Sequence, residues 1–236
     1  MERLRRKAEQ LNIQLNDNQL EQFRMYYEML VEKNKVMNLT AITEFEEVLD
    51  KHFIDSILLG TVMELKWNSS VIDVGTGAGF PGIPLKIIYP HLKVTLLDSL
   101  NKRVNFLNEV IHALELTDIT AIHSRAEDGA RNPLYREAFD LCVSRAVANL
   151  STLSEYCLPF VKKSGYFVSY KASQIQEELE QAEHAVKILG GKLESVQSVT
   201  LPESDIIRQF VCIQKVKNTP KTYPRKAGTA SKQPIV

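Results

Sequence analysis

Hydrophobic residues recur at helical spacing through the first quarter of the chain. Behind Asn16, apolar side chains follow one another every three or four residues to about Asn34. Gln19 stands three residues after Asn16, which is the spacing of a reciprocal capping box at a helix start. A second helical segment has its apolar positions between Val48 and Val62. Residues 1–67 are therefore expected to form an N-terminal helical extension.

After this extension the pattern changes to short apolar runs that alternate with helical segments. The runs expected to be strands are 70–74, 93–98, 119–123, 139–144, 165–170, 193–201 and 209–215. The helices expected between them are 83–89, 102–114, 149–160 and 174–189. Such alternation indicates a parallel sheet with helices on both faces, and the last two strands are close enough to pair antiparallel. We therefore predict an α/β fold, a doubly wound and mostly parallel seven-stranded sheet, over residues 68–216.

Composition and charge narrow the classes of partner. The chain has 236 residues, 44% of them hydrophobic, and 29 Lys/Arg balance 29 Asp/Glu. A zero formal charge excludes a global field that attracts anionic partners. Basic residues nevertheless gather at the end of the chain, where residues 217–236 are predicted to be an irregular tail. Such a tail is typical of a solvated end or of a contact with an anionic partner.

Cysteine usage and the N-terminus bear on location. The three cysteines are an odd number without metal-ligand spacing, so we expect reduced core thiols and no metal site. The charged start has no apolar leader segment, and no run approaches the ~18–20 apolar residues of a membrane span. These features predict a cytoplasmic protein that does not enter a membrane.

A glycine loop is the strongest candidate for a binding site. Gly75, Gly77, Gly79 and Gly82 follow the strand expected at 70–74, and they are four of the chain's ten glycines. Open α/β sheets bind nucleotide-like ligands beyond the carboxyl ends of their strands. Residues 77–82 also fit the dinucleotide pattern G-x-G-x-x-G, which alone is a weak signal.

Two nucleotide cofactors compete for this loop. A dinucleotide pyrophosphate needs free backbone N–H groups at a helix N-terminus, whereas Asp73 places a carboxylate below the loop and Pro81 lacks an N–H. S-adenosylmethionine has no phosphate, and an acidic loop attracts its sulfonium and ammonium groups. Asp98 ends the second strand, where it can accept both ribose hydroxyls, and Glu127 follows the third. Acids after three successive strands favour S-adenosylmethionine, although each acid by itself is compatible with an ordinary loop residue.

The end of the fourth strand should meet the methyl acceptor, and it contains Ser144 and Arg145. It has neither the Asn/Asp-Pro-Pro-aromatic run used for exocyclic amino groups nor a Pro-Cys nucleophile. An acceptor that is already nucleophilic therefore remains, such as guanine N7, which carries a lone pair and no proton. Arg145 is expected to position the reactants, without a general base. Its fork suits phosphate, guanine O6 or the methionine carboxylate, and it could instead pair with a loop acid.

A set of motifs in a fixed order makes the chain similar to a known family. The motifs are Asn38-Leu-Thr40, Lys51-His-Phe-Ile-Asp-Ser56, Asp73–Pro84, Leu97-Asp-Ser-Leu-Asn-Lys-Arg103 with Phe106-Leu107, Ser124-Arg-Ala-Glu127, Ser144-Arg-Ala-Val147, Lys171, and Tyr223-Pro-Arg-Lys226. They closely resemble the glucose-inhibited division protein B family, the bacterial small-subunit ribosomal RNA guanine-N7 methyltransferases. The resemblance covers nearly the whole chain.

This resemblance implies a class I S-adenosylmethionine-dependent methyltransferase that acts on one guanine N7 of small-subunit (16S) rRNA near the decoding centre. It also implies cofactor contacts at Gly77, Gly82, Ala126, Glu127 and Arg145. We expect a monomeric protein whose partner is this RNA, either naked or inside the assembled 30S subunit. A dinucleotide-dependent oxidoreductase and a catalytically silent RNA-binding assembly factor are the alternatives.

The remaining polar candidates are assigned to RNA, each with a structural alternative. They are His52, Asp55, Lys171, Arg208, Tyr223, Arg225 and Lys226. His52 and Asp55 share a helix face and could hold a base or the Asn38 loop, or instead link the extension to the sheet. The basic tail could follow the RNA backbone and Tyr223 could stack on a base. Ala227 and Ala230 replace prolines common in the family, so the tail is expected to be more flexible.

Overall fold

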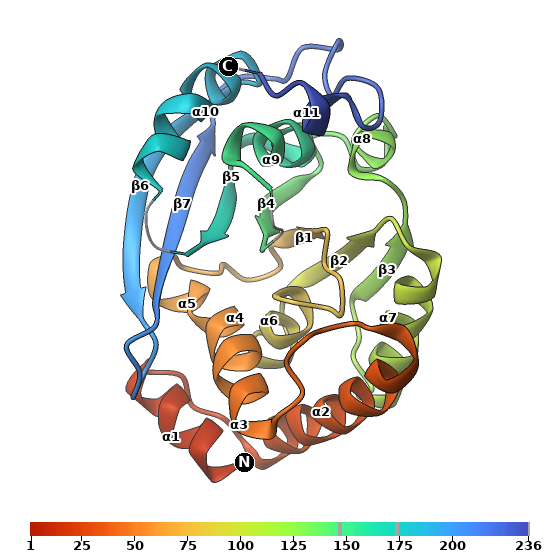
Figure 1. Ribbon diagram of the computed structural model, residues 1–236, viewed down its shortest axis with the longest axis vertical. Coiled ribbons are helices and arrows are strands. Elements are labelled where there is room, and N and C mark those ends of the chain that lie inside the picture. The colour runs from red at the N-terminus through yellow and green to blue at the C-terminus, as the bar shows by residue number, and fades with distance from the viewer. Residues whose placement is uncertain (146–147, 173–174, 236) are drawn as a thin grey trace.

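A computed structural model describes residues 1–145, 148–172 and 175–235. It contains one seven-stranded sheet in the order β3-β2-β1-β4-β5-β7-β6 (Figure 1). The strands are β1 Ser70–Val74, β2 Lys93–Asp98, β3 Ile119–His123, β4 Phe139–Ser144, β5 Val161–Lys171, β6 Gly191–Thr200 and β7 Ile207–Lys215. Neighbouring strands pair in parallel, except that β7 is antiparallel to both β5 and β6. The predicted doubly wound, mostly parallel sheet is confirmed.

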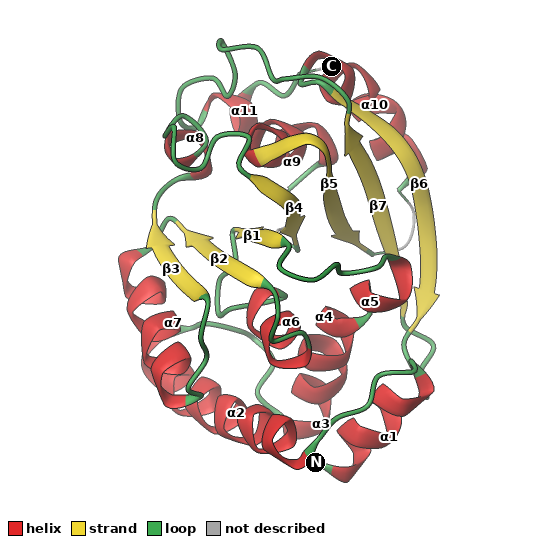
Figure 2. Ribbon diagram, turned by 180° about the vertical axis from the view of Figure 1, so that it is seen from behind, coloured by secondary structure: helices red, strands yellow, loops and turns green. Residues whose placement is uncertain are grey.

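Helices cover both faces of this sheet (Figure 2). The N-terminal helices are α1 Glu2–Gln10, α2 Asp17–Met37, α3 Phe45–Val48, α4 Asp55–Ile57 and α5 Leu59–Val62. The others are α6 Gly82–Ile88, α7 Asn101–Ala113, α8 Ala126–Gly129, α9 Leu150–Cys157, α10 Gln176–Ile188 and α11 Thr229–Lys232. Gln174, the predicted start of the helix at 174–189, lies outside the described residues.

The alternation of side chains along β1 divides the hydrophobic core into two layers. Val71 faces a cluster that includes α1, α2, α6 and α7, whereas Ile72 faces a second cluster that includes α9 and α10. Phe23 and Leu30 of α2 are completely buried in the first cluster. The N-terminal extension therefore shares its core with the sheet and forms one of its two covering layers.

The local signals at the start of α2 correspond to the observed geometry. The Asn16 side chain accepts from the Gln19 N–H at 2.8 Å, and the Gln19 side chain accepts from the Asn16 N–H at 3.1 Å. A different geometry occurs in the second helical segment, where Leu49–Ile54 form a π-helix before α4. The extra residue per turn rotates the following residues relative to a regular α-helix, and such segments are frequent at functional sites.

The C-terminal tail is docked against the rest of the protein. It contains the short helix α11, and it lies along α9 and α8 at the top of the molecule (Figure 1). The Thr152 hydroxyl donates to the Ala230 carbonyl at 3.1 Å, and Ala230 is 1% exposed. The tail is therefore irregular outside α11, and its residue Ala230 is buried beside α9.

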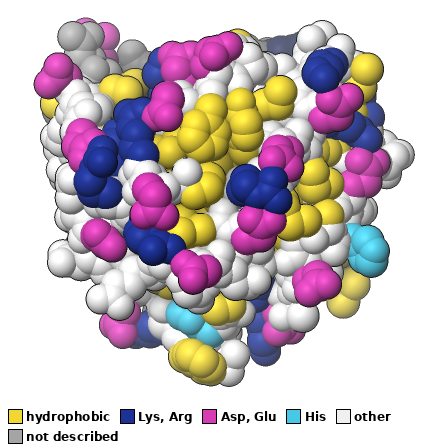
Figure 3. Space-filling view, turned by 90° about the horizontal axis from the view of Figure 1, so that it is seen from below, with side chains coloured by type: hydrophobic (Ala, Val, Ile, Leu, Met, Phe, Trp, Pro, Cys, Tyr) yellow, Lys and Arg dark blue, Asp and Glu magenta, His cyan; other side chains and the backbone are white. Residues whose placement is uncertain are grey.

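Charges of both signs are mixed on the face formed by α1, α2 and α3. Figure 3 shows Lys/Arg and Asp/Glu side chains side by side, with hydrophobic patches between them. Arg24 pairs with Glu21 at 2.5 Å and also with Glu28, and Arg3 pairs with Asp50 at 2.7 Å. This face consequently has no broad field of one sign among the side chains that the view draws. Among the described residues, no helix has the length and hydrophobicity needed to cross a membrane.

Candidate cofactor and acceptor site

A pocket of about 590 Å³ lies at the carboxyl ends of three neighbouring strands. Gly75 follows β1, Asp98 ends β2, and Ala126 and Glu127 follow β3. The opposite wall consists of Ala148 and the α9 residues Leu153 and Tyr156. The structure therefore brings together four of the residues that sequence reasoning assigned to the cofactor, although they span more than fifty positions of the chain.

Asp98 connects the glycine loop to the second strand. Its Oδ2 accepts from the Gly77 N–H at 2.9 Å, and its Oδ1 accepts from the Leu100 N–H at 2.9 Å. Arg103 approaches Oδ2 at 3.5 Å. Because an ionised carboxylate has about four lone-pair positions, both oxygens can still accept hydrogen bonds from a ligand's hydroxyl groups.

The glycines of the loop have different surroundings. A Cβ on Gly77 would meet no atom within 4 Å, and its φ of +63° lies in the left-handed region. A Cβ on Gly82 would come within 2.9 Å of Asp73 Oδ2, and one on Gly79 within 2.6 Å of the Tyr26 hydroxyl. Gly77 thus faces open space, whereas Gly79 and Gly82 allow close packing inside the protein.

The helix that follows the loop has no free N–H in its first turn for a pyrophosphate. The Gly82 N–H donates to Asp73 at 2.8 Å, and the Ile83 N–H donates to the Gly79 carbonyl at 2.8 Å. Pro84 has no N–H, and the Leu85 N–H donates to a carbonyl one turn earlier. Pyrophosphate recognition requires such donors to be available, so this geometry disfavours a dinucleotide.

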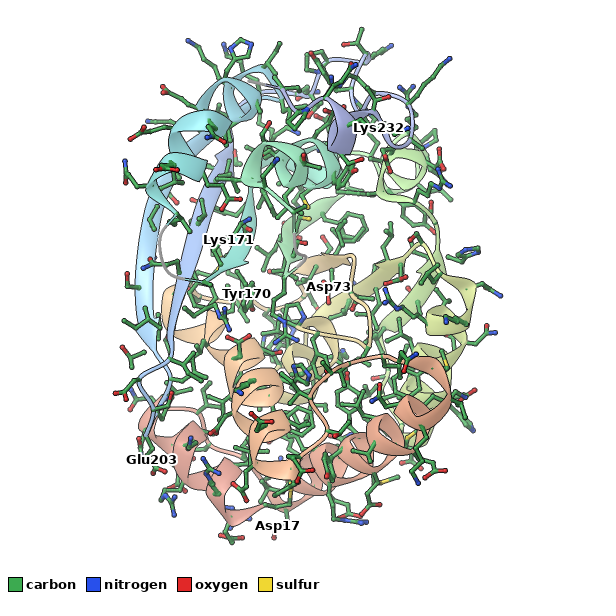
Figure 4. All side chains as sticks on the ribbon, viewed as in Figure 1. Asp17, Asp73, Tyr170, Lys171, Glu203 and Lys232 are labelled. Carbon is green, nitrogen blue, oxygen red and sulfur yellow. The ribbon has the colours of Figure 1, made fainter. Side chains whose placement is uncertain are left out.

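Asp73 is completely buried under the loop, near the middle of the molecule (Figure 4). Its Oδ2 accepts from the Thr76 hydroxyl at 2.7 Å as well as from Gly82, but its Oδ1 has no hydrogen-bond partner among the described residues. Burial raises the pKa of Asp73 to about 6, despite these hydrogen bonds and the nearby Arg145. A buried carboxylate oxygen without a partner suits a cationic ligand, so the residues present fit S-adenosylmethionine.

Arg145 follows β4 and contacts the N-terminal extension. Its Nη1 donates to Asp55 Oδ2 at 2.8 Å and to the Lys51 carbonyl at 3.0 Å. Its Cζ lies 5.1 Å from the ring centre of Phe80 in the glycine loop, within the range of a cation–π interaction. Ala146 and Val147, the other half of this motif, lie outside the described residues.

His52 adds a neutral contact to Arg145. His52 Nδ1 lies 3.2 Å from Arg145 Nη2 and 3.1 Å from the Lys51 carbonyl, and Nε2 lies 2.8 Å from the Thr40 hydroxyl. In the tautomer whose Nδ1 accepts from Arg145, Nε2 carries the proton and donates to Thr40. Burial, and secondarily Arg145, lowers the pKa of His52 to about 4, so the ring is uncharged at neutral pH. The π-helix and α4 therefore position His52 and Asp55 against the end of β4.

The other residues assigned to RNA differ in how far contacts inside the protein already engage their side chains. Arg208 of β7 contacts Asp55, and Lys171 donates to the Ala148 carbonyl at 2.6 Å and to Glu178 at 2.5 Å. Arg225 forms a two-pronged ion pair with Glu155, which is 1% exposed. Tyr223 packs against the second hydrophobic cluster, whereas Lys226 is exposed. In this conformation, Lys171 and Arg225 hold parts of the protein together.

The tail also reaches the cofactor pocket through Glu127, whose Oε1 accepts from the Gly228 N–H at 2.8 Å. Sequence reasoning missed this contact and the contributions of Tyr26, Phe80 and Tyr156. The Tyr26 hydroxyl donates to the Ala78 carbonyl at 2.6 Å and so supports the loop from α2. Phe80 had one available signal, its place inside the glycine motif. No motif in the sequence singled out Tyr26 or Tyr156, which lie within α2 and α9.

Comparison with known proteins gives a family match over most of the chain. The model of the family described as rRNA small subunit methyltransferase G matches residues 19–207. A protein of Lachnoclostridium phytofermentans, "Ribosomal RNA small subunit methyltransferase G", is 57% identical over 96% of this chain and 93% of its own length. A protein of the same name from Alkaliphilus metalliredigens is 51% identical over 97% of this chain and 95% of its own length.

Solved structures share the fold at low sequence identity. The M. jannaschii TYW2 structure in complex with AdoMet has a TM-score of 0.56 and 15% identity, covering 75% of this chain and 80% of its own. The P. horikoshii TYW2 structure in complex with MeSAdo has a TM-score of 0.54 and 15% identity, covering 73% of this chain and 63% of its own. The sheet described above is therefore that of class I S-adenosylmethionine-dependent methyltransferases.

Proposed function

Because the chain belongs to the rRNA small subunit methyltransferase G family, as its motifs predicted, we propose that it methylates small-subunit ribosomal RNA. The methyl donor is S-adenosylmethionine, and the acceptor is N7 of one guanine in a loop near the decoding centre. The protein acts as a monomer, and the RNA can be presented within the small subunit.

One observation supports the donor most strongly. The carboxyl ends of β1, β2 and β3 line a single pocket that holds Asp98 and Glu127 as well as Arg103 and Arg125, while the first turn of α6 offers no free N–H to a phosphate. Asp98 would hold the ribose hydroxyls, Glu127 and Ala126 would border the adenine, and Asp73 would lie beneath the cationic end. Bound S-adenosylmethionine supplies an electrophilic methyl group on its sulfonium.

The chain's own residues then have to position the acceptor. Guanine N7 already has a lone pair in the base plane and loses no proton when it is methylated, so no general base is required. His52 is uncharged at neutral pH and is fully engaged by Arg145 and Thr40, which agrees with a supporting role. Arg145, fixed over Phe80, would direct a donor to the O6 edge of guanine next to N7. Catalysis here consists mainly of holding two reactants in line.

A labelling experiment tests the proposed reaction. Purified protein, methyl-labelled S-adenosylmethionine and either small-subunit rRNA or small subunits from cells lacking this protein should give label in the RNA. The product should be N7-methylguanine, which borohydride reduction and aniline cleavage locate at one position. Label on another base or another atom of guanine would refute the acceptor. RNA binding without any label would indicate a silent assembly factor.

The pKa of Asp73 predicts a pH dependence of cofactor binding. A cationic ligand prefers the ionised carboxylate, and in the free protein this form is lost as the pH falls through about 6. We expect the dissociation constant for S-adenosylmethionine to rise about tenfold between pH 7 and pH 5, since one pKa unit corresponds to a tenfold change. Calorimetric titration at several pH values measures this, and Asp73→Asn should bind more weakly with a flat profile. A flat wild-type profile would contradict the assignment.

Without ligand, the free energy of unfolding should change with pH in the opposite direction to cofactor binding. The folded pKa of Asp73 lies above its ordinary value of 3.8, so the contribution of this group to stability is complete below 3.8. That contribution is lost as the pH rises through 6. Denaturant unfolding of wild type and Asp73→Asn in the absence of cofactor separates this effect from the pH dependence of binding.

A further inference from the structure

Asp55 joins two arginines from distant strands at the acceptor side of the site. Its Oδ1 accepts from Arg208 Nε at 2.5 Å, while its Oδ2 accepts from Arg145 Nη1 at 2.8 Å. Asp55 is 0% exposed, whereas the Arg208 and Arg145 side chains are 18% and 17% exposed. The carboxylate therefore lies behind the two guanidinium groups and fixes them side by side.

The guanidinium of Arg208 retains most of its donors. Asp55 engages only Nε, and no other hydrogen bond of Arg208 is found within the residues that the structure describes. An arginine has five N–H donors in a planar fork, so four remain on the two terminal nitrogens. The donors of Arg145 are by contrast largely used by Lys51, His52 and Asp55.

Arg208 also lies at the edge of the sheet where β4 and β5 end. Since β7 is antiparallel to β5, the first residues of β7 lie at the carboxyl end of β5, and Gln209 pairs with Lys171. This is the edge at which β4 ends before Arg145. Tyr170, which lies close to Lys171 in Figure 4, supports this corner by donating its hydroxyl hydrogen to the Ser56 carbonyl at 2.9 Å.

We propose that Arg208, held by Asp55, forms a phosphate-binding clamp for the RNA backbone beside the methyl acceptor. This inference rests on the proposed function, and it names the part of the substrate that this corner binds. A guanidinium fork matches phosphate oxygens in a two-pronged geometry. Asp55 is then a positioning residue, because it touches no substrate and sets the direction of both forks.

The charges around the clamp favour an anion. Arg145, Arg208 and Asp55 together carry a net charge of one positive unit, His52 is uncharged at neutral pH, and the other nearby carboxylate, Asp73, is completely buried beneath the glycine loop near Arg145. The neighbouring lysines are already neutralised, Lys171 by Glu178 and Lys51 by Glu47. The exposed part of this corner therefore consists of guanidinium groups, although the total formal charge of the chain is zero. Phosphate contacts position an RNA without reading its sequence.

Arg208→Gln tests the clamp, because it removes the fork and keeps a polar side chain. We expect KM for small-subunit rRNA to rise about tenfold, while kcat and the dissociation constant for S-adenosylmethionine stay within twofold. The slope of log Kobs against log salt for RNA binding should fall by about 0.7–0.9, the value for one lost phosphate contact. Arg208→Lys should recover part of the affinity and the whole salt slope.

Arg24→Gln is the matched control, since it removes one arginine from an ion pair on the exposed face of α2. It should change neither KM nor the salt slope. Asp55→Asn is less suitable, because two partly buried cations without their carboxylate would test folding instead.

The outcomes separate the clamp from the proposed reaction. If wild type methylates rRNA and Arg208→Gln retains both its KM and its salt slope, the clamp is refuted and the reaction stands. If Arg208→Gln weakens S-adenosylmethionine binding as much as RNA binding, Arg208 serves the fold of the site and the clamp is again refuted. If wild type does not methylate RNA at all, the proposed function fails, and the salt slope of RNA binding still reports on the clamp.

Discussion

Gly77→Val is expected to abolish binding of S-adenosylmethionine while the protein remains folded. A Cβ at this position meets no protein atom within 4 Å, so the added side chain extends into open space, which we propose the cofactor occupies when bound. The φ of +63° adds backbone strain, which costs of order 1–3 kcal/mol for such a residue. Small domains are typically stable by about 5–15 kcal/mol, so this strain alone should not unfold the chain.

Calorimetry and denaturant unfolding of the same preparation measure both effects. Gly77→Ala is the graded control, because it shares the positive φ and lacks the branched methyl groups. We expect alanine to weaken binding about tenfold and valine to remove it, with similar losses of unfolding free energy. Equal affinity losses in the two variants would mean that loop distortion, and not occupancy of the cofactor's space, is responsible. Unchanged affinity in Gly77→Val would overturn the location of the site.

Arg145→Ala should reduce methyl transfer far more than it reduces the folded population. Without the guanidinium, Asp55 still pairs with Arg208, but Asp55, the Lys51 carbonyl and His52 each lose a donor. We expect the free energy of unfolding to fall by about 3–5 kcal/mol, as for a broken buried ion pair, which a domain stable by about 5–15 kcal/mol can lose while it stays folded. The acceptor loses its orienting donor, and removal of one such preorganised donor typically lowers kcat about 100- to 1000-fold. Single-turnover methylation of rRNA, measured under conditions where circular dichroism shows the variant to be folded, checks this expectation.

Arg145→Lys distinguishes positioning from structure. A lysine retains the positive charge next to Asp55, but it lacks the planar fork that contacts Lys51, His52 and Phe80 together. We expect lysine to recover most of the lost unfolding free energy and little of the lost rate. If activity and stability recovered in parallel, Arg145 would be an internal ion-pair partner and the acceptor would need another orienting group.

The alternation of strands and helices could be predicted from the sequence because it depends on local side-chain spacing. Side-chain periods of about two and 3.6 residues indicate which segments bury one face, and they gave the seven strands to within a few residues of the observed bounds. Strand β5 was the main exception, since it begins at Val161 and passes through Lys162, Lys163 and Ser164. Polar residues at that exposed end of the strand masked its continuation in the sequence.

The residues on the cofactor side of the candidate site could also be predicted from the sequence. Asp98 ends a predicted strand and Glu127 follows one, and parallel strands place their carboxyl ends along one edge. The pocket that these two acids share follows from the topology of the sheet, whereas Asp73 is buried beneath the glycine loop. The reasons for individual glycines did not follow, because Gly79 and Gly82 are close to Tyr26 and Asp73 only after α2 and α6 have packed.

The sequence by itself thus determined the strands of the sheet, the helical extension and a glycine loop suited to a cofactor without phosphate, and it identified the family. All of these depend on residue type and local spacing. Tertiary structure alone decided what the acceptor side contains. Arg145 meets Asp55 across 90 positions, and Arg208 meets it across 153. No periodicity encodes such pairs, because they form only when the N-terminal layer packs on the sheet. The carboxylate that this packing buries is then costly unless it is paired with cations. The docked tail has the same origin, because Glu155 and Glu127 become partners for Arg225 and Gly228 only once α8 and α9 are in place.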